Sequence, residues 1–338
     1  MRNHWGSASR ASVTVVLMIS AFVVVAVLAL AACGGSDATP STSPTVAASG
    51  DGATPLPTPT VAGTIAFSNR AASEANPDIY VVNADGTGLT QLTDDPGGDD
   101  HPSWSPDGQK IVYSILPPGT DSWDCTVWVM NADGSGKKEL SKQLPKGCGG
   151  VWPTWSPDGK HIAFSMLTTL PSLDVCVMNA DGSGLKRVFT PGKMKEVFGP
   201  SWTPDGRILF LKDGDIFSVN PDGSGLAPLT KGRSIRGYAL SPDGKRIAVH
   251  DLASLRAEVA AAWGGGARVT LLDPVSDFIT YDPFVAPAWT PDGKALALAS
   301  ASDRGSTGSR LYIVNADGSG LSAVPGIDHA LEPAWRPE

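Results

Sequence analysis

The sequence predicts an all-β fold, a ring of six blades that each contain four antiparallel strands. Two short motifs carry this prediction: Trp-Ser-Pro-Asp-Gly and Asn-Ala-Asp-Gly, each with close variants. Successive copies lie roughly 40 to 50 residues apart with strand-like apolar runs between them, which is the spacing of β-propeller blades. The composition agrees, because 38 Gly and 28 Pro with only 18% charged residues suit short strands and tight turns.

Each motif has the residues of a hairpin turn. In Ser-Pro-Asp-Gly, Pro presets the φ of the first central position and Gly takes the left-handed conformation. In Asn-Ala-Asp-Gly, we expect the Asn side chain to close an Asx-turn and Gly to supply a positive φ. The first motif begins at Trp104, Trp155, Trp202, Leu240, Trp289 and Trp335. The second begins at Asn83, Asn131, Asn179, Asn220 and Asn315, with Leu272-Asp273-Pro274 as its degraded sixth copy.

These turns divide each repeat into four strands. The second repeat illustrates the order from the inside of the ring outwards: 103–104, 110–114, 126–131 and 137–141. The last copy of the first motif stops at Glu338, and the domain opens with the strands 64–68, 78–83 and 89–93. We therefore expect the C-terminal strand 333–336 to be the innermost strand of the first blade. Such a shared blade closes the ring and leaves no open edge.

The N-terminus has the features of a membrane-targeting segment. Arg2 and Arg10 precede an apolar run from Val13 to Leu30. Leu30-Ala31-Ala32-Cys33 follows and resembles the bacterial lipobox, so we expect residues 1–32 to be a signal peptide and Cys33 to be lipidated. The alternative is an uncleaved transmembrane helix, because the run is just long enough to span. Both readings place the rest of the chain outside the cytoplasm, anchored to the membrane.

The predicted domains are therefore the signal peptide at 1–32, a linker at 33–62 and the propeller at 63–338. The linker is rich in Ser, Thr, Pro, Gly and Ala and lacks the large apolar side chains that would offset its ordering entropy. The formal charge of the whole sequence is -8, from 26 Lys and Arg against 34 Asp and Glu. This balance argues against a nucleic-acid partner, and we expect a monomer.

The paired motifs resemble the repeats of TolB-type six-bladed propellers over nearly all of 63–338. The resemblance implies a propeller fold and a role at the cell envelope through protein contacts. The same propeller also serves as the non-catalytic domain of peptidases. The long amino-terminal domain of TolB has no counterpart in this sequence, so the resemblance does not extend to a role in the Tol system.

In a four-stranded meander both motif turns lie on one face of the ring, here called the motif face. The loops that join second to third strands, and blade to blade, lie on the opposite face, here called the open face. Six residues, each three positions before an inner-strand Trp or Leu, form a ring around the channel mouth on the open face. This mouth ring consists of His101, Trp152, Gly199, Gly237, Ala286 and Glu332.

The open face mixes charged and aromatic residues, whereas the motif face is repetitive. We therefore predict that a peptide or small-molecule site lies at the channel mouth. The candidate residues are His101, Trp152, Arg236, Tyr238, Phe284, His329 and Glu332. Ordinary solvated loop residues are the alternative interpretation.

The cysteines that follow Cys33 are Cys125, Cys148 and Cys176. Cys125 and Cys148 are expected on the open face of the same blade, so we predict a disulfide between them in an oxidising compartment. Cys176 occupies a third-strand position and is predicted to be a buried thiol.

The sequence favours a binding module over an enzyme. Gly-x-Ser-x-Gly and His-Glu-x-x-His are both absent, and no cofactor motif is present. Two alternatives remain. One is a hydrolase or lyase with a divalent metal held by His101 and His329 together with Asp100 or Glu332. The other is a structural envelope protein without a specific ligand.

One repeat departs from the pattern. Leu240 replaces the motif Trp, and a long insertion at 251–268 follows in the same blade. The apolar residues of this insertion have helix-like spacing, so we predict a short helix that caps a loop. The functional alternative is a lid or partner-binding element.

Overall fold

A computed structural model describes residues 61–70, 76–118, 124–145, 148–169, 172–192, 197–251, 256–263, 268–272, 286–300 and 309–338. These residues lie in one compact unit, Thr54–Glu338. The predicted signal peptide, Cys33, most of the linker and Phe284 fall outside the described residues.

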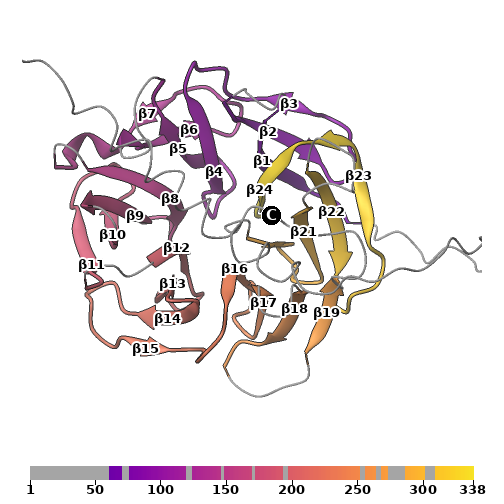
Figure 1. The fold of residues 1–338 in the computed structure, drawn as a ribbon. Helices are drawn as coiled ribbons and strands as arrows, with labels where there is room; N and C mark the ends of the chain where they lie inside the picture. Colours follow the sequence, from indigo (N-terminus) through magenta and orange to yellow (C-terminus); the bar gives the residue numbers. More distant parts are fainter. Residues whose placement is uncertain are drawn as a thin grey trace, which may run out of the picture. The chain divides into compact units, whose positions relative to one another are not determined.

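The described residues form six antiparallel four-stranded sheets arranged as blades around a common centre (Figure 1). Blade 1 comprises β24 (Ala330–Trp335), β1 (Thr64–Asn69), β2 (Asp78–Asn83) and β3 (Thr90–Gln91). Blade 2 comprises β4 (Gly98–Trp104), β5 (Lys110–Leu116), β6 (Thr126–Asn131) and β7 (Lys138–Glu139). Blade 3 comprises β8 (Gly149–Trp155), β9 (His161–Thr169), β10 (Ser172–Asn179) and β11 (Lys186–Phe189).

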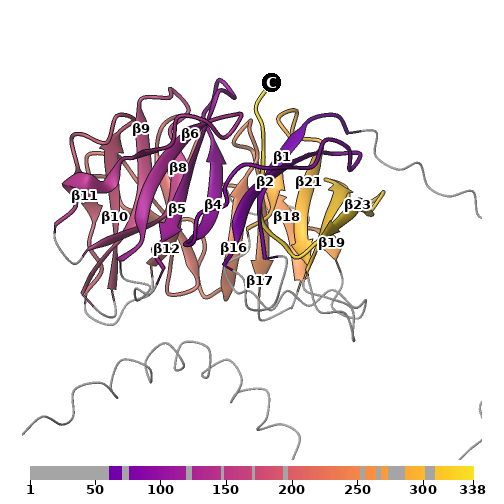
Figure 2. The same cartoon turned by 90° about the horizontal axis from the view of Figure 1, so that it is seen from above.

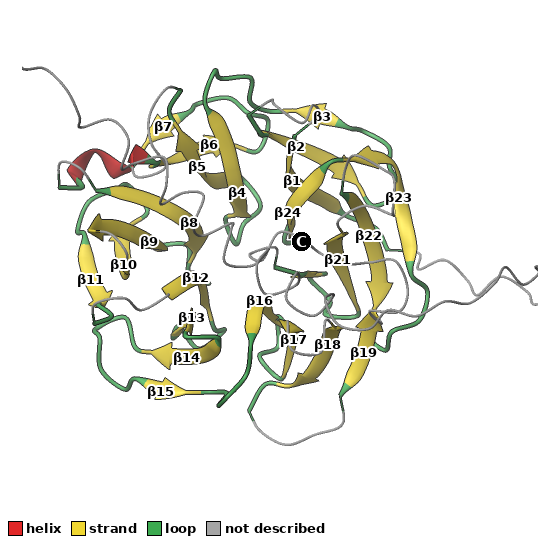
Figure 3. Ribbon diagram, in the orientation of Figure 1, coloured by secondary structure: helices red, strands yellow, loops and turns green. Residues whose placement is uncertain are grey.

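The remaining blades follow the same order from the inner to the outer strand. Blade 4 comprises β12 (Val197–Trp202), β13 (Ile208–Lys212), β14 (Asp215–Val219) and β15 (Ala227–Pro228). Blade 5 comprises β16 (Ile235–Leu240), β17 (Arg246–Asp251), β18 (Arg256–Ala261) and β19 (Val269–Leu272). Blade 6 comprises β20 (Ala288–Trp289), β21 (Ala295–Ser300), β22 (Arg310–Asn315) and β23 (Ser322–Asp328). The described helical structure is one 3-10 turn, Ser141–Gln143 (Figure 3).

The six-bladed all-β prediction is confirmed, and so is the shared blade. β24 pairs with β1 as the innermost strand of blade 1, with Ile65 opposite Trp335 and Ala66 opposite Ala334. Figure 2 shows the blades from the side, with the C-terminus close to β1. The ring is therefore closed by main-chain hydrogen bonds between the two ends of the domain.

Hydrogen bonds from Trp104, Trp202 and Trp289 join neighbouring blades, whereas the indole N–H groups of Trp155 and Trp335 have no hydrogen-bond partner in the described structure. The indole N–H of Trp104 donates to Ala334 O at 3.2 Å, and that of Trp202 donates to Thr154 O at 3.2 Å. Each acceptor lies on the inner strand of the preceding blade, one residue before that blade's own motif Trp. The hydrophobic core accordingly consists of clusters between blades, and Trp104 packs with Tyr113 and Ile79 in one of them.

The first motif forms the predicted turn. The carboxylate of Asp107 accepts hydrogen bonds from the Ser105 hydroxyl at 2.6 Å and from Gln109 N at 3.0 Å, and Gly108 has a φ of 64°. The hydrogen bond from Ser105 lowers the pKa of the Asp107 carboxyl, as does the one from Gln109.

The prediction for the second motif named the wrong side chain. The turn is closed by Asp85, whose carboxylate accepts from Thr87 N at 2.9 Å, and not by Asn83. The Asn83 amide instead donates to the Thr87 hydroxyl at 3.0 Å. Asp133 and Ser135 repeat this arrangement in blade 2. A carboxylate accepts from two donors at once, which makes Asp the better acceptor at this position.

The predicted helix in the 251–268 insertion is wrong. Its central part is β18, which pairs with β17 so that Val259 lies opposite Ala248. The second-motif turn of this blade follows β18, where Ala262 N–H donates to Lys245 O at 2.9 Å, whereas Leu272, which was expected to begin it, is the last residue of β19. The sequence does not show the alternation of apolar and polar residues typical of a strand, because one buried position is occupied by the charged residue Glu258. This residue is 7% exposed and contacts Arg233 and Arg268.

At the seam between blades 4 and 5, Leu240 has no indole N–H, and a tyrosine supplies a hydrogen bond between the inner strands. The hydroxyl of Tyr238 donates to Gly199 O on the inner strand of blade 4 at 2.7 Å. Tyr238 occupies the place that Pro takes in the five other blades. The hydrogen bond that Leu240 cannot donate is therefore replaced by one from Tyr238, two residues earlier on the same strand.

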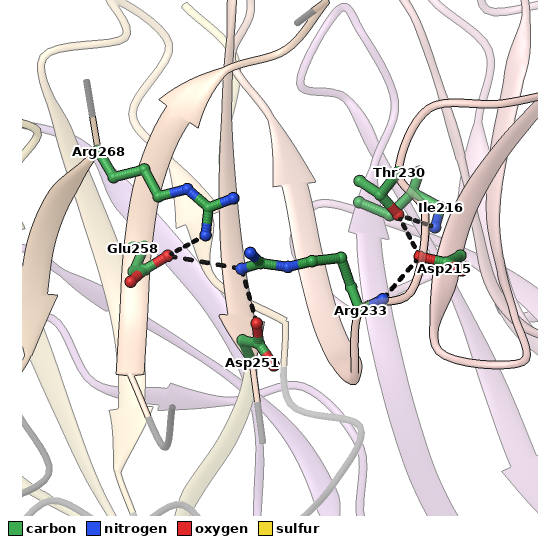
Figure 4. A network of polar contacts seen from close by, with 7 residues as sticks. All are labelled: Asp215, Ile216, Thr230, Arg233, Asp251, Glu258 and Arg268. Atoms are coloured by element: carbon green, nitrogen blue, oxygen red, sulfur yellow. Dashed lines mark hydrogen bonds and ion pairs between the residues drawn. The ribbon is translucent and has the colours of Figure 1, made fainter. Parts of the chain in front are cut away.

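An ionic network adds to this seam (Figure 4). Arg233, in the connection from β15 to β16, contacts Asp251 at 2.6 Å and Glu258 at 3.7 Å. Arg268 reaches Glu258 from the other side at 3.0 Å. The main-chain N–H of Arg233 donates to Asp215 of blade 4 at 3.1 Å, so the network links the two blades.

Candidate functional site

The six residues of the mouth ring line one cavity, here called the mouth cavity, of about 160 Å³. Arg236, Tyr238, Phe198 and Leu211 also contribute to its wall. The cavity therefore extends from the channel mouth into the seam between blades 4 and 5. Because Gly199 and Gly237 lie side by side in the ring order, two neighbouring ring positions of the mouth carry no side chain.

Backbone geometry directs the other ring residues. His101, Trp152 and Glu332 have φ values of 57°, 52° and 50°, and Gly199 has the equivalent value of 54°. Each of these residues precedes a proline, and the pairing of β4 and of β8 with the next strand shifts register at this point. Bulges of this kind turn a side chain away from its regular direction.

The left-handed conformation is uncommon for side chains other than Gly, Asn and Asp, and a bulky residue such as Trp is a genuine outlier there. Each instance costs on the order of 1 to 3 kcal/mol and persists only where the surrounding structure enforces it. This conformation occurs at the same structural position in three blades, so strained backbone is found at the channel mouth.

An aromatic arc covers one side of the mouth. The rings of His101 and Trp152 meet edge to face with centroids 5.4 Å apart, and Trp152 meets Phe198 in the same way at 5.6 Å. Phe198 is not among the site residues predicted from the sequence, although it immediately precedes the ring residue Gly199 on β12. Such edge-to-face contacts prearrange an apolar surface that can receive a ligand.

Charged groups lie next to this arc. The Nε2 atom of His101 lies 3.9 Å from Glu332 Oε1, and its Nδ1 atom lies 4.0 Å from Asp100 Oδ2. Asp100 is itself held in place, because its Oδ1 accepts hydrogen bonds from the Ser68 hydroxyl and from His101 N. The mouth therefore combines an imidazole between two carboxylates with the guanidinium of Arg236, which also lines the cavity.

Tyr238 has a structural role within the site. Its hydroxyl donates to Gly199 O and accepts from the Ser201 hydroxyl at 3.1 Å, and the residue is 5% exposed. Burial raises the pKa of the phenol well above its ordinary value, so it remains protonated. Tyr238 therefore fixes the wall of the mouth cavity and is not poised for proton transfer.

The structure brings together five of the seven predicted site residues: His101, Trp152, Arg236, Tyr238 and Glu332. His329 is not among the residues that line the mouth cavity, and its carbonyl accepts from Arg70 N at 3.2 Å. Phe284 lies outside the described residues. Within the described part of the chain, no group of three His, Cys, Asp or Glu side chains is arranged to hold a metal ion.

The described residues contain no disulfide between Cys125 and Cys148. Gly150 N donates to Cys125 O at 2.8 Å, so the chain just after Cys148 runs beside Cys125, whereas the Cys148 side chain packs against the hydrophobic cluster that contains Cys176. Burial, together with Asp100 and Asp124, raises the pKa of the Cys125 thiol to about 12. The pairing stays a prediction, which peptide mapping under non-reducing conditions tests. Cys176 is fully buried, as predicted.

No family model matches the sequence. Dipeptidyl-peptidase 5 of Porphyromonas endodontalis is 23% identical over 266 residues, 68% of this chain and 33% of that protein. The Tol-Pal system protein TolB of Alcanivorax borkumensis is 31% identical over 94 residues, 28% of this chain and 20% of that protein. The chain thus spans a third or less of the length of these relatives.

Among solved structures, TolB from Acinetobacter baumannii superimposes with a TM-score of 0.65 at 20% identity, covering 82% of this chain and 67% of that one. The described residues include no helix with the length and hydropathy needed to cross a bilayer. In fold, then, the chain is a TolB-like six-bladed β-propeller.

Proposed function

We propose that this chain is an extracytoplasmic lipoprotein whose propeller binds a protein or peptide at the channel mouth of the open face. The observation that carries the proposal is the left-handed conformation of His101, Trp152 and Glu332. A fold without a ligand has no reason to retain this strain in three blades, whereas a binding surface uses it to hold side chains in position. The aromatic arc and the neighbouring charges supply the mixture of contacts found in binding sites.

The relatives support a protein partner at the cell envelope. TolB, which resembles this chain in fold and in part of its sequence, is named as a protein of the Tol-Pal system. From this likeness we propose only that the chain binds another protein. We further propose that it does so as a monomer and without a cofactor.

Photocrosslinking in cells tests the site. A benzoyl-phenylalanine at Phe198, on the mouth, is expected to give a discrete adduct with a partner protein. The matched control is the same substitution at Leu226, which also lies in blade 4 but beside a motif turn and is 46% exposed. An adduct from position 226 alone, or none from position 198 in the folded protein, contradicts the proposal.

The anchor is tested separately. We propose that Cys33 receives the lipid and that the linker joins it to the propeller on the motif face. Cys33→Ser is expected to abolish metabolic labelling with a fatty acid and to release the protein from the membrane fraction. Retention of the variant in that fraction would favour an uncleaved transmembrane segment instead.

A hydrolase is the second candidate, and the sequence similarity to Dipeptidyl-peptidase 5 over 68% of this chain favours it. In the form we consider, a metal at the channel mouth would be bound with the help of His101. Metal analysis of the purified protein and of His101→Ala tests this form. Bound metal that is lost in the variant supports the metal-dependent hydrolase, and its absence from both proteins contradicts that form alone.

A further inference from the structure

Among the described residues, the large apolar side chains that are exposed all lie on the motif face. Leu89, Leu226 and Leu321 are 48%, 46% and 38% exposed, and Trp263 is 54% exposed. Each leucine follows the second motif of its blade and immediately precedes the outer strand, and the three are here called the apolar rim. Trp263 lies in the corresponding turn of blade 5, next to residues that the structure does not describe, so the three leucines carry the inference.

The same repeat position has a different character in blades 2 and 3. Blade 2 has Lys137 there, and its ammonium group pairs with Asp95 at 3.1 Å. Blade 3 has Leu185, which is partly buried and packs against the hydrophobic cluster between blades 2 and 3. In the described part of the chain, the exposed leucines are therefore confined to the side of the ring that runs from blade 4 to blade 1.

The chain enters the propeller on the same face and at the same side of the ring. Gly63 O accepts a hydrogen bond at 3.0 Å from Ala84 N, which belongs to the second motif of blade 1, and Leu89 follows in the same turn. The residues that precede the described propeller, 1–60, contain the apolar run and Cys33, which we propose as the anchor. An anchored propeller therefore has part of the apolar rim beside the point from which the chain leads back to the bilayer.

The turns that carry the apolar rim are acidic. Asp85, Asp222 and Asp317 lie in them, and each carboxylate accepts a hydrogen bond from the main-chain N–H two residues later. Because an anionic bilayer surface repels carboxylates, an attraction between these turns and lipid comes from apolar contact of the leucines and favours headgroups without net charge.

Isolated exposed leucines are common on protein surfaces and need no explanation. The apolar rim differs because its members share one repeat position, one side of the ring and the face of chain entry. A tether also keeps the rim at a high local concentration near the lipid, so a contact that is weak on its own is sufficient. We propose that the apolar rim rests on the surface of the bilayer that holds the anchor, with its leucines at the level of the headgroups. This inference rests on the proposed lipidation of Cys33.

Photocrosslinking to lipid tests this in the full-length lipoprotein reconstituted into phosphatidylcholine vesicles. Benzoyl-phenylalanine in place of Leu226 is expected to form a covalent adduct with the phospholipid, which its mass distinguishes from an adduct with protein. The yield is expected to be the same in high salt, because salt does not screen apolar contacts. The matched control is the same substitution at Lys137, the equivalent position of blade 2, and a second control is Phe198 at the channel mouth. Neither control position is expected to give a lipid adduct.

Two double variants complete the test. Leu89→Gln combined with Leu321→Gln is expected to reduce the lipid adduct from position 226, because the rest of the apolar rim is then polar. Lys137→Gln combined with Lys138→Gln is expected to leave that adduct unchanged. Equal lipid adducts from positions 226, 137 and 198 would show that the tethered propeller has no preferred face and would overturn the inference. So would the lack of a lipid adduct from position 226 in protein that stays in the vesicles, or an adduct there with a second copy of the chain. Release of the protein from the vesicles would refute the proposed anchor, and this inference with it.

Discussion

Three side chains at the channel mouth adopt a backbone conformation that costs stability. For L-residues the left-handed region is unfavourable by about 1 to 2 kcal/mol per residue. His101, Trp152 and Glu332 all adopt it, and at the equivalent site of blade 4 the chain has Gly199 instead. The same backbone turn is therefore available without a side chain, and under the proposed function the three side chains are retained for binding.

This interpretation predicts the relative stability of two truncations. Trp152→Gly should be more stable than Trp152→Ala by about 1 kcal/mol, because both lose the indole but only Gly relieves the strain. The measurement is urea unfolding of both variants. At Trp155, which has no positive φ, the order should reverse because Gly loses more backbone entropy there than Ala does. The same order at both positions would show that the strain at Trp152 is negligible.

A second residue-scale prediction concerns Asp99, which is fully buried on β4. Burial raises the pKa of its carboxyl from 3.8 to about 7. Because the folded-state pKa lies above the unfolded one, the contribution to stability is fully present below the unfolded pKa and is lost as the pH rises through the folded pKa. This group alone should therefore make the protein more stable at about pH 5 than at about pH 8, by on the order of 2 to 3 kcal/mol.

Urea unfolding of wild type and Asp99→Asn across that pH range checks this effect. The amide is neutral throughout, so the variant should lose this dependence and gain stability relative to wild type at the alkaline end. Asp107→Asn is the control, since hydrogen bonds lower the pKa of that carboxyl and its contribution is instead lost as the pH falls. If wild type and Asp99→Asn have parallel pH profiles, the carboxyl titrates normally.

At the scale of elements, the seam between blades 4 and 5 shows how one blade replaces a missing tryptophan. Tyr238 supplies the hydrogen bond between inner strands, and Arg233 supplies an ionic link further out. Asp251 and Glu258 are 4% and 7% exposed, and the Arg233 guanidinium contacts both carboxylates. Removal of one partner from a buried ion pair is far more costly than removal of the whole pair.

Arg233→Met should therefore destabilise the protein by about 3 to 5 kcal/mol. The matched control is Lys294→Met, which removes a pair with Asp292 in which the lysine side chain is 82% exposed, and it should cost less than about 1 kcal/mol. Both are measured by equilibrium unfolding. Similar losses in the two variants would mean that the network contributes no more than a surface ion pair.

The same blade shows the limits of prediction from sequence. Turns were recognisable wherever Pro, Asp and Gly fix local conformation, so the boundaries of most strands followed from Trp-Ser-Pro-Asp-Gly and Asn-Ala-Asp-Gly. In blade 5 the second turn has Ala262 and Trp263 instead, and the strand before it contains Glu258. Neither a turn motif nor an alternating pattern marks this strand in the sequence. The burial of Glu258 becomes understandable only from its contacts with Arg233, which is distant in sequence, and with Arg268, which lies beyond the following turn.

For the candidate site, repeat arithmetic alone placed the mouth ring. His101 and Glu332 each lie three residues before a motif Trp, which places them on neighbouring blades. In the structure His101 Nε2 lies 3.9 Å from Glu332 Oε1. The positive φ values were not predictable, because the residue before a proline ordinarily prefers an extended conformation.

At the scale of the whole molecule, the way in which the ring closes determines on which face the two ends of the propeller lie, and therefore which face remains available to a partner. Arg336, just beyond β24, stacks over Trp104 and donates to Gly108 O of a motif turn at 3.0 Å. At the other end of the domain, Gly63 O accepts from Ala84 N in the second motif of blade 1 at 3.0 Å. Both ends of the propeller thus lie on the motif face, and the proposed anchor leaves the open face directed away from the membrane.

The central claim, that function resides at the channel mouth, is tested most directly by filling the mouth cavity. A Cβ added at Gly199 meets no atom within 4 Å, and the φ there matches that of His101 in blade 2, so Gly199→His should fold. Gly206→His, at an equally open left-handed glycine on the motif face of the same blade, is the control. The measurement is recovery of the photocrosslinked partner. We predict its loss in Gly199→His and its retention in Gly206→His, whereas retention in Gly199→His with loss in Gly206→His would place the binding site on the motif face.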